Sequence, residues 1–180
     1  YIWGAQIEAN DFPTSYIPTS GSTVTRSPDG VSITNAELTS WFGNGNAGTV
    51  VATASRSAPE TYNVDSLIWK FRDPGRKEHN AKYTGFQFYD ASGYTSGNSS
   101  RHYYYPNVPN KSGFSFEPNN VRSAVNGILG PLDTSWTPSA HTTLNIGSNN
   151  ANNLFLNGHI NRFSFYDRRV SDAELETLTS

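Results

Sequence analysis

The 180-residue chain contains no cysteine and no methionine, and it has four lysines. Without cysteine there is no disulfide frame and no thiolate chemistry, so a stable domain needs a large core or oligomerisation. Because the chain starts at Tyr1 and lacks methionine, we expect a fragment or a processed piece of a longer protein. Strong helix formers rarely cluster, which favours strands as the main secondary structure.

Long apolar runs and basic patches are also missing. No apolar run approaches the roughly 20 residues of a membrane span, which argues against membrane insertion. The formal net charge is −2, and the basic pairs Arg76-Lys77 and Arg168-Arg169 do not extend into a stripe. A nucleic-acid partner is therefore not expected.

The residue spacings typical of an enzyme active site are absent from the sequence. Glycoside hydrolysis needs two carboxylates flanking the scissile bond, and the acids here are scattered singly. No Gly-x-Ser-x-Gly elbow is present, and His79, His102 and His141 never pair at the spacing of a zinc site. We predict no catalytic residues and no enzyme; the enzymatic alternative is a glycosidase with acids on separate loops.

Aromatic residues are plentiful, with ten Tyr, ten Phe and four Trp. Leu67, Trp69 and Phe71 alternate with Lys70 and Arg72, which predicts a half-buried strand. Trp41 and Trp69 fit such apolar patterns and are expected in the core. Similar patterns predict further strands at 49–54, 86–88, 114–116, 121–125, 144–146, 154–156 and 160–166.

Turn signals separate these strands, and a helix-cap signal follows the last one. Asn126-Gly127 predicts a type I′ hairpin, and Asn157-Gly158 predicts a second turn before the last strand. The one helix that the sequence predicts begins at a Ser171 cap, with Glu174 in the capping-box position. Nine to thirteen short antiparallel strands with one terminal helix indicate an all-β sandwich or jelly roll.

The chain divides into two unequal parts. Residues 1–26 alternate like a strand and then carry Phe12-Pro13 and Ile17-Pro18, which favour extended backbone. We interpret 1–26 as a strand and an extended connector from a preceding domain. The domain itself is expected at 27–180, beginning with the turn signal of residues 27–30.

The segment 158–175, GHINRFSFYDRRVSDAEL, resembles the closing strand and turn of laminin-G-like, concanavalin A-like jelly rolls. The resemblance implies a two-sheet antiparallel jelly-roll sandwich with a short C-terminal helix. Ile160, Phe163 and Phe165 reach one core only if a bulge resets the alternation between Ile160 and Phe163.

The opening residues are similar to segments of phage tail-fibre and tailspike proteins, and of some bacterial surface or polysaccharide-processing proteins. The phrases that carry this resemblance are residues 3–8, 14–19 and 24–26. It implies an extracellular or virion-surface (phage tail) location, a polysaccharide or cell-surface glycan as partner, and a homotrimer.

The aromatic run at 99–107 is the most distinctive candidate site. Sugars bind to aromatic platforms edged by planar polar groups, and three consecutive tyrosines cannot all face inward on a strand. The candidate carbohydrate-binding residues are Arg101, His102, Tyr103, Tyr104, Tyr105, Asn107 and, in a second loop, Trp136. Two alternatives for the outward tyrosine are packing under a loop and contact at a subunit interface.

Calcium is a further expectation, since laminin-G-like sandwiches often hold one through Asp, Asn and backbone oxygens. The candidate ligands are Asp65, Asp90, Asn119 and Asn120, with solvated loop polars as the alternative. No other cofactor is predicted.

These patterns lead to one functional hypothesis and two alternatives. The hypothesis is a non-catalytic domain of a phage tail fibre or tailspike that binds host glycan. The alternatives are a structural or trimerisation cap of a fibre, and a carbohydrate-binding module attached to a bacterial polysaccharide-degrading enzyme.

Overall fold

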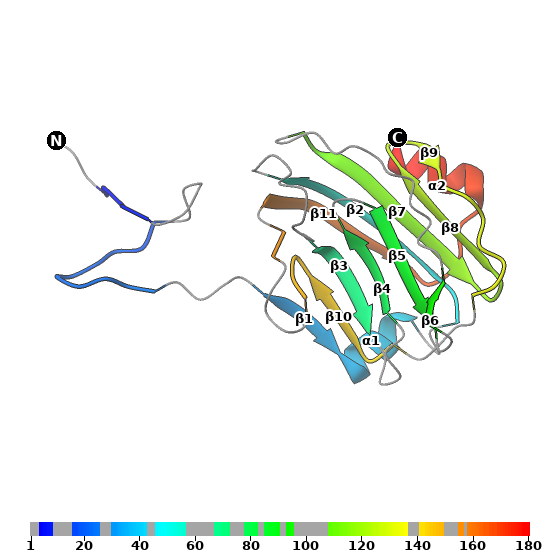
Figure 1. The fold of residues 1–180 in the computed structure, drawn as a ribbon, viewed down its shortest axis with the longest axis horizontal. Coiled ribbons are helices and arrows are strands. Elements are labelled where there is room, and N and C mark those ends of the chain that lie inside the picture. Colours follow the sequence, from blue (N-terminus) through cyan, green and yellow to red (C-terminus); the bar gives the residue numbers. More distant parts are fainter. Residues whose placement is uncertain are drawn as a thin grey trace.

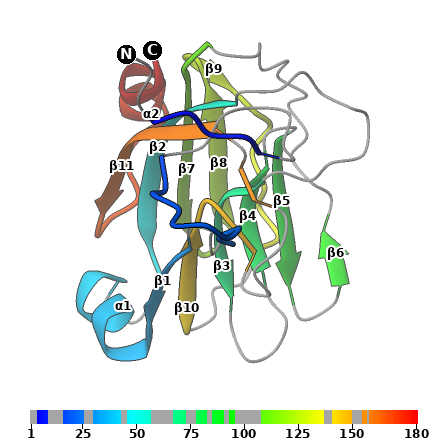
Figure 2. The same ribbon diagram turned by 90° about the vertical axis from the view of Figure 1, so that its left-hand side faces the viewer.

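A computed structural model shows two antiparallel sheets packed face to face, flanked by two short helices (Figures 1 and 2). It describes residues 4–8, 16–25, 30–42, 46–56, 67–72, 78–82, 85–90, 93–95, 108–136, 141–149, 155–156 and 158–180. Of the strands 78–82, 85–90 and 93–95, it describes the backbone. The predicted fold class, an antiparallel two-sheet sandwich with a short C-terminal helix, is confirmed.

Eleven strands within these residues form the two layers. Sheet A has six strands in the order β1 (Val31–Thr34), β10 (Thr143–Ile146), β3 (Leu67–Arg72), β4 (Glu78–Lys82), β5 (Gly85–Asp90) and β6 (Gly93–Thr95). Sheet B has five in the order β11 (Gly158–Tyr166), β2 (Gly48–Arg56), β7 (Asn110–Glu117), β8 (Asn120–Val125) and β9 (Ile128–Leu129). The helices are α1 (Asn35–Phe42) and α2 (Asp172–Thr179).

The core lies between the sheets and pairs large side chains with small ones. Trp69 of sheet A is fully buried, as predicted, and its ring centroid lies 5.7 Å from that of Phe114 of sheet B. Ala52 and Ala54 of sheet B are buried in the same cluster, and Ala52 lies in the row next to Phe114. Small residues on one sheet leave room for a bulky aromatic on the other, which is how sandwich cores reach native packing density.

The predicted reset of alternation in β11 is confirmed. The pairing of β11 with β2 shifts register between Ile160 and Arg162, so Asn161 is the extra residue of a bulge. Beyond it, Phe163 and Phe165 pack against the same core as Ile160. Gly158 opens the strand where a Cβ would lie 2.0 Å from the carbonyl oxygen of Ser55. Glycine is therefore required at this close approach of two backbones.

Two further local predictions are confirmed. Asn126 and Gly127 have φ values of 48° and 76° and connect β8 to β9 as a two-residue turn. Ser171 adopts extended backbone before α2, and its Oγ accepts a hydrogen bond from the Glu174 amide at 3.2 Å.

Three local predictions fail or fall outside the described chain. Residues 35–42 form the helix α1, which the sequence did not predict, and Trp41 on it is 43% exposed rather than buried in the core. Of the expected strand 154–156, residues 155 and 156 form no strand, and Leu154 lies outside the described residues. Asn157, the first residue of the second expected turn, lies outside them as well.

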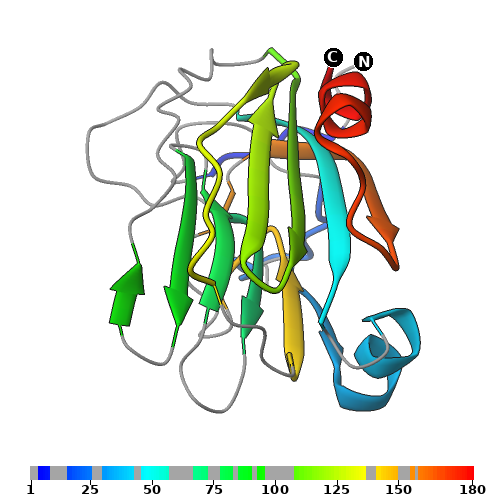
Figure 3. The same ribbon diagram turned by 90° about the vertical axis from the view of Figure 1, so that its right-hand side faces the viewer.

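The helices lie at opposite ends of the sandwich (Figure 3). Leu38 of α1 is buried in the core cluster at the end of sheet A. Helix α2 covers the outer face of sheet B, where Leu175 and Thr179 lie over Gly113 of β7. A Cβ at Gly113 would come within 2.8 Å of both side chains, so glycine allows the helix to dock closely.

The described N-terminal residues lie outside the sandwich (Figure 1). Residues 4–8 and 16–25 form no helix or strand. They pack on each other, since the Ile17 amide donates to Gln6 Oε1 at 2.9 Å and the Tyr16 ring lies beside Gly4. The first strand of the sandwich begins at Val31, close to the predicted domain boundary.

Candidate functional site

The predicted aromatic site cannot be placed on this structure. Arg101, His102, Tyr103, Tyr104, Tyr105 and Asn107 lie outside the described residues, and so does Asp65. Asp90 ends β5, where its backbone pairs with Gly93. The assignment of these residues to glycan or calcium stays a prediction.

The prediction that Trp136 is a sugar-stacking platform is wrong. Its side chain is 1% exposed, and its ring meets Phe116 edge-on with the centroids 5.5 Å apart. Its carbonyl oxygen also accepts a hydrogen bond from the Asn119 amide at 2.9 Å. The loop thus carries Trp136 into the core, where aromatic packing stabilises the sandwich.

Asn119 and Asn120, predicted as calcium ligands, have structural roles at the β7–β8 turn. Asn119 has a φ of 55°, a conformation that asparagine tolerates. Asn120 Nδ2 donates to Glu117 Oε1 at 2.6 Å, and the Asn120 carbonyl accepts from Arg169 Nε at 3.2 Å. The Arg169 guanidinium thus lies at the carbonyl oxygen that a calcium ion would need. In the part of the chain that the structure describes, no three His, Asp or Glu side chains cluster as metal ligands would.

Sheet A presents a polar row on its outer face. Leu144, Trp69 and Phe71 point into the core, so Asn145 and Lys70, which alternate with them, lie on the opposite face. The strand register continues the row onto β1, where Ser32 lies opposite Asn145. We call Ser32, Asn145 and Lys70 the sheet A polar row.

Two members of the sheet A polar row are buried although they face away from the core. Lys70 is 7% exposed and Asn145 is 4% exposed. Lys70 Nζ donates to Asn149 Oδ1 at 3.2 Å, from the segment that follows β10. Asn145 Nδ2 finds no hydrogen-bond partner among the described residues. A buried N–H without an acceptor is costly, so the Asn145 amide favours an acceptor oxygen at this position.

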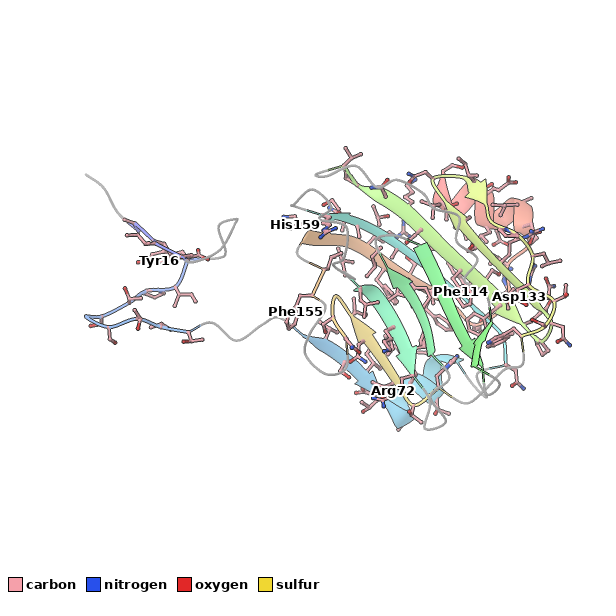
Figure 4. All side chains as sticks on the ribbon, in the orientation of Figure 1. Tyr16, Arg72, Phe114, Asp133, Phe155 and His159 are labelled. Atoms are coloured by element: carbon pink, nitrogen blue, oxygen red, sulfur yellow. The ribbon has the colours of Figure 1, made fainter. Side chains whose placement is uncertain are left out.

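The next outward-facing residue of β3 after Lys70 is Arg72. Arg72, labelled in Figure 4, ends β3 with an exposed side chain, and the register places Thr143 on one side of it and Glu78 on the other. Thr142 fixes this end of the strand, because its amide donates to the Arg72 carbonyl at 2.8 Å.

The sequence did not identify the sheet A polar row as a site. The alternation at 67–72 placed Lys70 and Arg72 on the outward face, but it gave no sign that Lys70 is buried. Asn145 and Ser32 are far from Lys70 in sequence, and the strand register brings the three together. The residues of the sheet A polar row could have been identified from the sequence if the strands that pair with β3 had been known.

The carboxylates with shifted pKa values belong to ion pairs on sheet B rather than to a catalytic pair. Burial raises the pKa of Asp172, but hydrogen bonds from Arg169 at 2.7 Å and Arg122 at 3.0 Å outweigh it and hold that pKa below its usual value. A bidentate hydrogen bond from Arg168 lowers the pKa of Glu174. A general acid needs a raised pKa instead.

Helix α2 and the ion pairs close much of the outer face of sheet B. The Arg169 and Arg122 side chains tie the start of α2 to β8, while Leu175 packs with Ala124. The outer face of sheet A is therefore the better candidate for ligand binding among the faces described. No helix in the described residues is long and apolar enough to cross a membrane.

Solved structures with the same architecture include domains of carbohydrate-active enzymes. A structure of NanB with optactamide matches with a TM-score of 0.61 and 18% identity, over 83% of this chain and 26% of NanB. A second NanB structure is described as the sialidase from Streptococcus pneumoniae. Domain 4 of AbnA, a GH43 extracellular arabinanase from Geobacillus stearothermophilus, in complex with arabinotriose, matches with a TM-score of 0.60 and 14% identity, over 75% of this chain and 67% of that one.

A third neighbour is a single module. The CBM40 of Ruminococcus gnavus IT-sialidase, bound to α2,3 sialyllactose, has a TM-score of 0.57 and 12% identity, over 85% of this chain and 97% of that one. These structural matches show a shared sandwich fold. No protein-family model matches the chain, and no characterised protein matches its sequence. The chain spans about a quarter of the length of NanB, 26% of it.

Proposed function

We propose that this chain is a non-catalytic carbohydrate-binding domain of an extracellular protein. The observation that carries the proposal is the sheet A polar row, which sets a hydroxyl, an amide and a lysine on the outer face of the sandwich. Amide and ammonium groups suit sugar hydroxyls and ring oxygens. The fold supports the proposal, because two of its structural neighbours were solved with arabinotriose and with α2,3 sialyllactose.

The absence of catalysis is part of the proposal. Among the described acids, Asp172 and Glu174 are held by arginines, and Asp133 caps its own turn by accepting from the Ser135 amide at 2.8 Å. Incubation with a polysaccharide panel should release no reducing sugar. Release above the level of a heat-denatured sample would instead support a glycosidase.

Two parents fit a domain of this kind. One is a polysaccharide-degrading enzyme that carries the chain as a binding module, which the neighbours NanB and AbnA favour because both are enzymes that contain such a sandwich. The other is a phage tail fibre or tailspike, which the resemblance of residues 1–26 favours. A catalytic domain encoded in the same gene would decide for the enzyme, and a fibre shaft would decide for the phage protein.

A glycan array followed by isothermal titration calorimetry tests the proposed function. We expect saturable binding to at least one polysaccharide or oligosaccharide class. If a broad array gives no ligand and light scattering shows a trimer, the chain is a structural cap rather than a binding domain. Three linked weak sites in a trimer would raise avidity, so single-site affinity is measured on the free oligosaccharide.

A tyrosine variant tests the predicted contribution of residues 101–107. Tyr104→Ala should weaken binding on the order of tenfold, because a stacked ring and its hydrogen bond are lost. Tyr16→Ala is the matched control, since Tyr16 is exposed and lies outside the sandwich (Figure 4). Equal affinities for both variants would remove Tyr104 from the site and leave the proposed function standing.

A further inference from the structure

Helix α1 exposes a tryptophan at the end of the sandwich. Leu38 holds the helix in place, since it is fully buried in the core cluster. Trp41 follows three residues later and is 43% exposed, although tryptophan side chains are mostly buried in folded proteins. Among the aromatic side chains that the structure describes in the sandwich, Trp41 is the most exposed. Part of its ring is therefore open to a ligand.

Glu37 lies one turn before Trp41 on the same face of α1. Residues four apart on a helix have Cβ atoms about 5–6 Å from each other, and an aromatic side chain leans toward the preceding turn. Glu37 is exposed, and its carboxylate has no hydrogen bond or ion pair with any residue that the structure describes. The Glu37 backbone carbonyl accepts from Ser40 Oγ at 2.7 Å. A carboxylate with free acceptor oxygens thus lies beside an open indole ring.

The charge around this pair determines which saccharides suit it. Glu37 is the single charged residue of α1 and of β1 and β10, the two strands that α1 packs against. A pyranose ring has an apolar C–H face that stacks on an indole and hydroxyl hydrogens that a carboxylate accepts. An acidic sugar would instead bring its own negative charge close to that of Glu37.

We propose that Trp41 and Glu37 form a subsite for a neutral pyranose residue of a polysaccharide. The sugar stacks its C–H face on the indole ring and donates hydroxyl hydrogens to the carboxylate. The inference rests on the proposed function and adds to it a binding position and a substrate class, the neutral glycans. The subsite lies beyond the sheet A polar row, on the helix that directly follows β1.

Variants of Trp41 test the stacking. Trp41→Leu keeps an apolar side chain that favours helix but removes the aromatic face, so it should weaken binding of a neutral oligosaccharide roughly three- to tenfold. Trp41→Phe keeps an aromatic platform and should retain most of the affinity. Tyr16→Leu is the matched control, because Tyr16 is 47% exposed and lies outside the sandwich. Titration calorimetry with cellohexaose, mannohexaose and galactohexaose measures the affinities, and thermal midpoints verify the fold of each variant.

A carboxylate variant tests the preference for neutral saccharides. Each oligosaccharide is compared with its C6-oxidised form, in which a carboxylate replaces the hydroxymethyl group, and the neutral form should bind about threefold or more tightly. Glu37→Gln should remove this preference, whereas Glu176→Gln on the exposed side of α2 should keep it. An acidic residue in the first turn also stabilises a helix, but a loss of helix stability alone would weaken the binding of both forms equally.

The outcomes separate this inference from the proposed function. If Trp41→Leu binds as tightly as Tyr16→Leu, or if only acidic saccharides bind, the Trp41 subsite is wrong and carbohydrate binding stands. A change of oligomeric state in Trp41→Leu with unchanged glycan affinity would make the ring a contact between copies and would overturn the subsite in the same way. If no saccharide of either kind binds, the proposed function fails, and the subsite fails with it.

Discussion

At the scale of single residues, Ser112 and Ser115 lie on opposite faces of β7 and have different surroundings. Ser115 lies on the outer face, where its Oγ donates to the Val170 carbonyl at 3.0 Å and lies 2.9 Å from Thr49 Oγ1. Ser112 faces the core side, and its Oγ has no hydrogen-bond partner in the described chain. Both serines are fully buried.

Replacing each serine by alanine should therefore have opposite effects. Ser115→Ala is expected to lower the free energy of unfolding by about 1–3 kcal/mol, because it leaves buried partners unsatisfied. Ser112→Ala removes an unpartnered hydroxyl and should be neutral or stabilising by about 1 kcal/mol. Urea denaturation with equal m-values measures both. A loss of stability in Ser112→Ala equal to that in Ser115→Ala would contradict this account.

At the scale of elements, the docking of α2 depends on its acidic first turn. Asp172 accepts hydrogen bonds from Arg169 and Arg122, and Ser171 caps the helix start. The pKa of Asp172 lies below its usual value because these hydrogen bonds outweigh the effect of burial, which raises the pKa most strongly. The ionised carboxylate therefore stabilises the native state.

The lowered pKa of Asp172 predicts that the free energy of unfolding depends on pH in the acid range. The contribution of Asp172 is fully present above its unfolded pKa of about 3.9 and is lost as the pH falls through its lower folded value. The difference in unfolding free energy between wild type and Asp172→Asn should shrink as the pH is lowered below about 4. Urea denaturation along a pH series measures it. Glu176→Gln, on the exposed side of the same helix, is the control, and an identical pH profile for the two variants would rule out the Asp172 contribution.

At the scale of the whole molecule, the N-terminal part is expected to be separable from the sandwich. Its described residues pack on one another and lie beside the sandwich in Figure 1. Deleting residues 1–26 should leave the thermal midpoint and the glycan affinity unchanged. Calorimetry of the full chain and of the shortened chain checks this, and a lower midpoint for the shortened chain would make 1–26 part of the domain.

The accuracy of the sequence predictions follows the range of the interactions involved. The Asn126-Gly127 turn, the Ser171 cap and the bulge at Asn161 were predictable because a few neighbouring residues decide each one. Trp136 was misassigned because its burial depends on Phe116, which lies on another strand. Helix α1 was missed because its apolar residues also fitted a strand pattern, and contacts at the end of sheet A decide for the helix.

The sheet A polar row belongs to the same class of long-range feature. Its members come from the three strands β1, β10 and β3, so no segment of sequence contains the site. The sequence showed that Lys70 faces outward, but its position beside Asn145 follows from strand order, and it also contacts Asn149 in the segment after β10. A candidate site of this kind becomes visible once the sheet has been assembled.

The position of β2 in sheet B has a consequence for how the chain folds. β2 lies between β7 and β11, and Thr49 at its start donates to the carbonyl of Arg168, 119 residues further along the chain. Such distant pairings carry a large loop-closure entropy, so folding is expected in milliseconds to seconds rather than microseconds. During synthesis, one edge of β2 stays unpaired until β11 has left the ribosome. We therefore expect newly made chains to be most prone to pairing with another molecule at that edge.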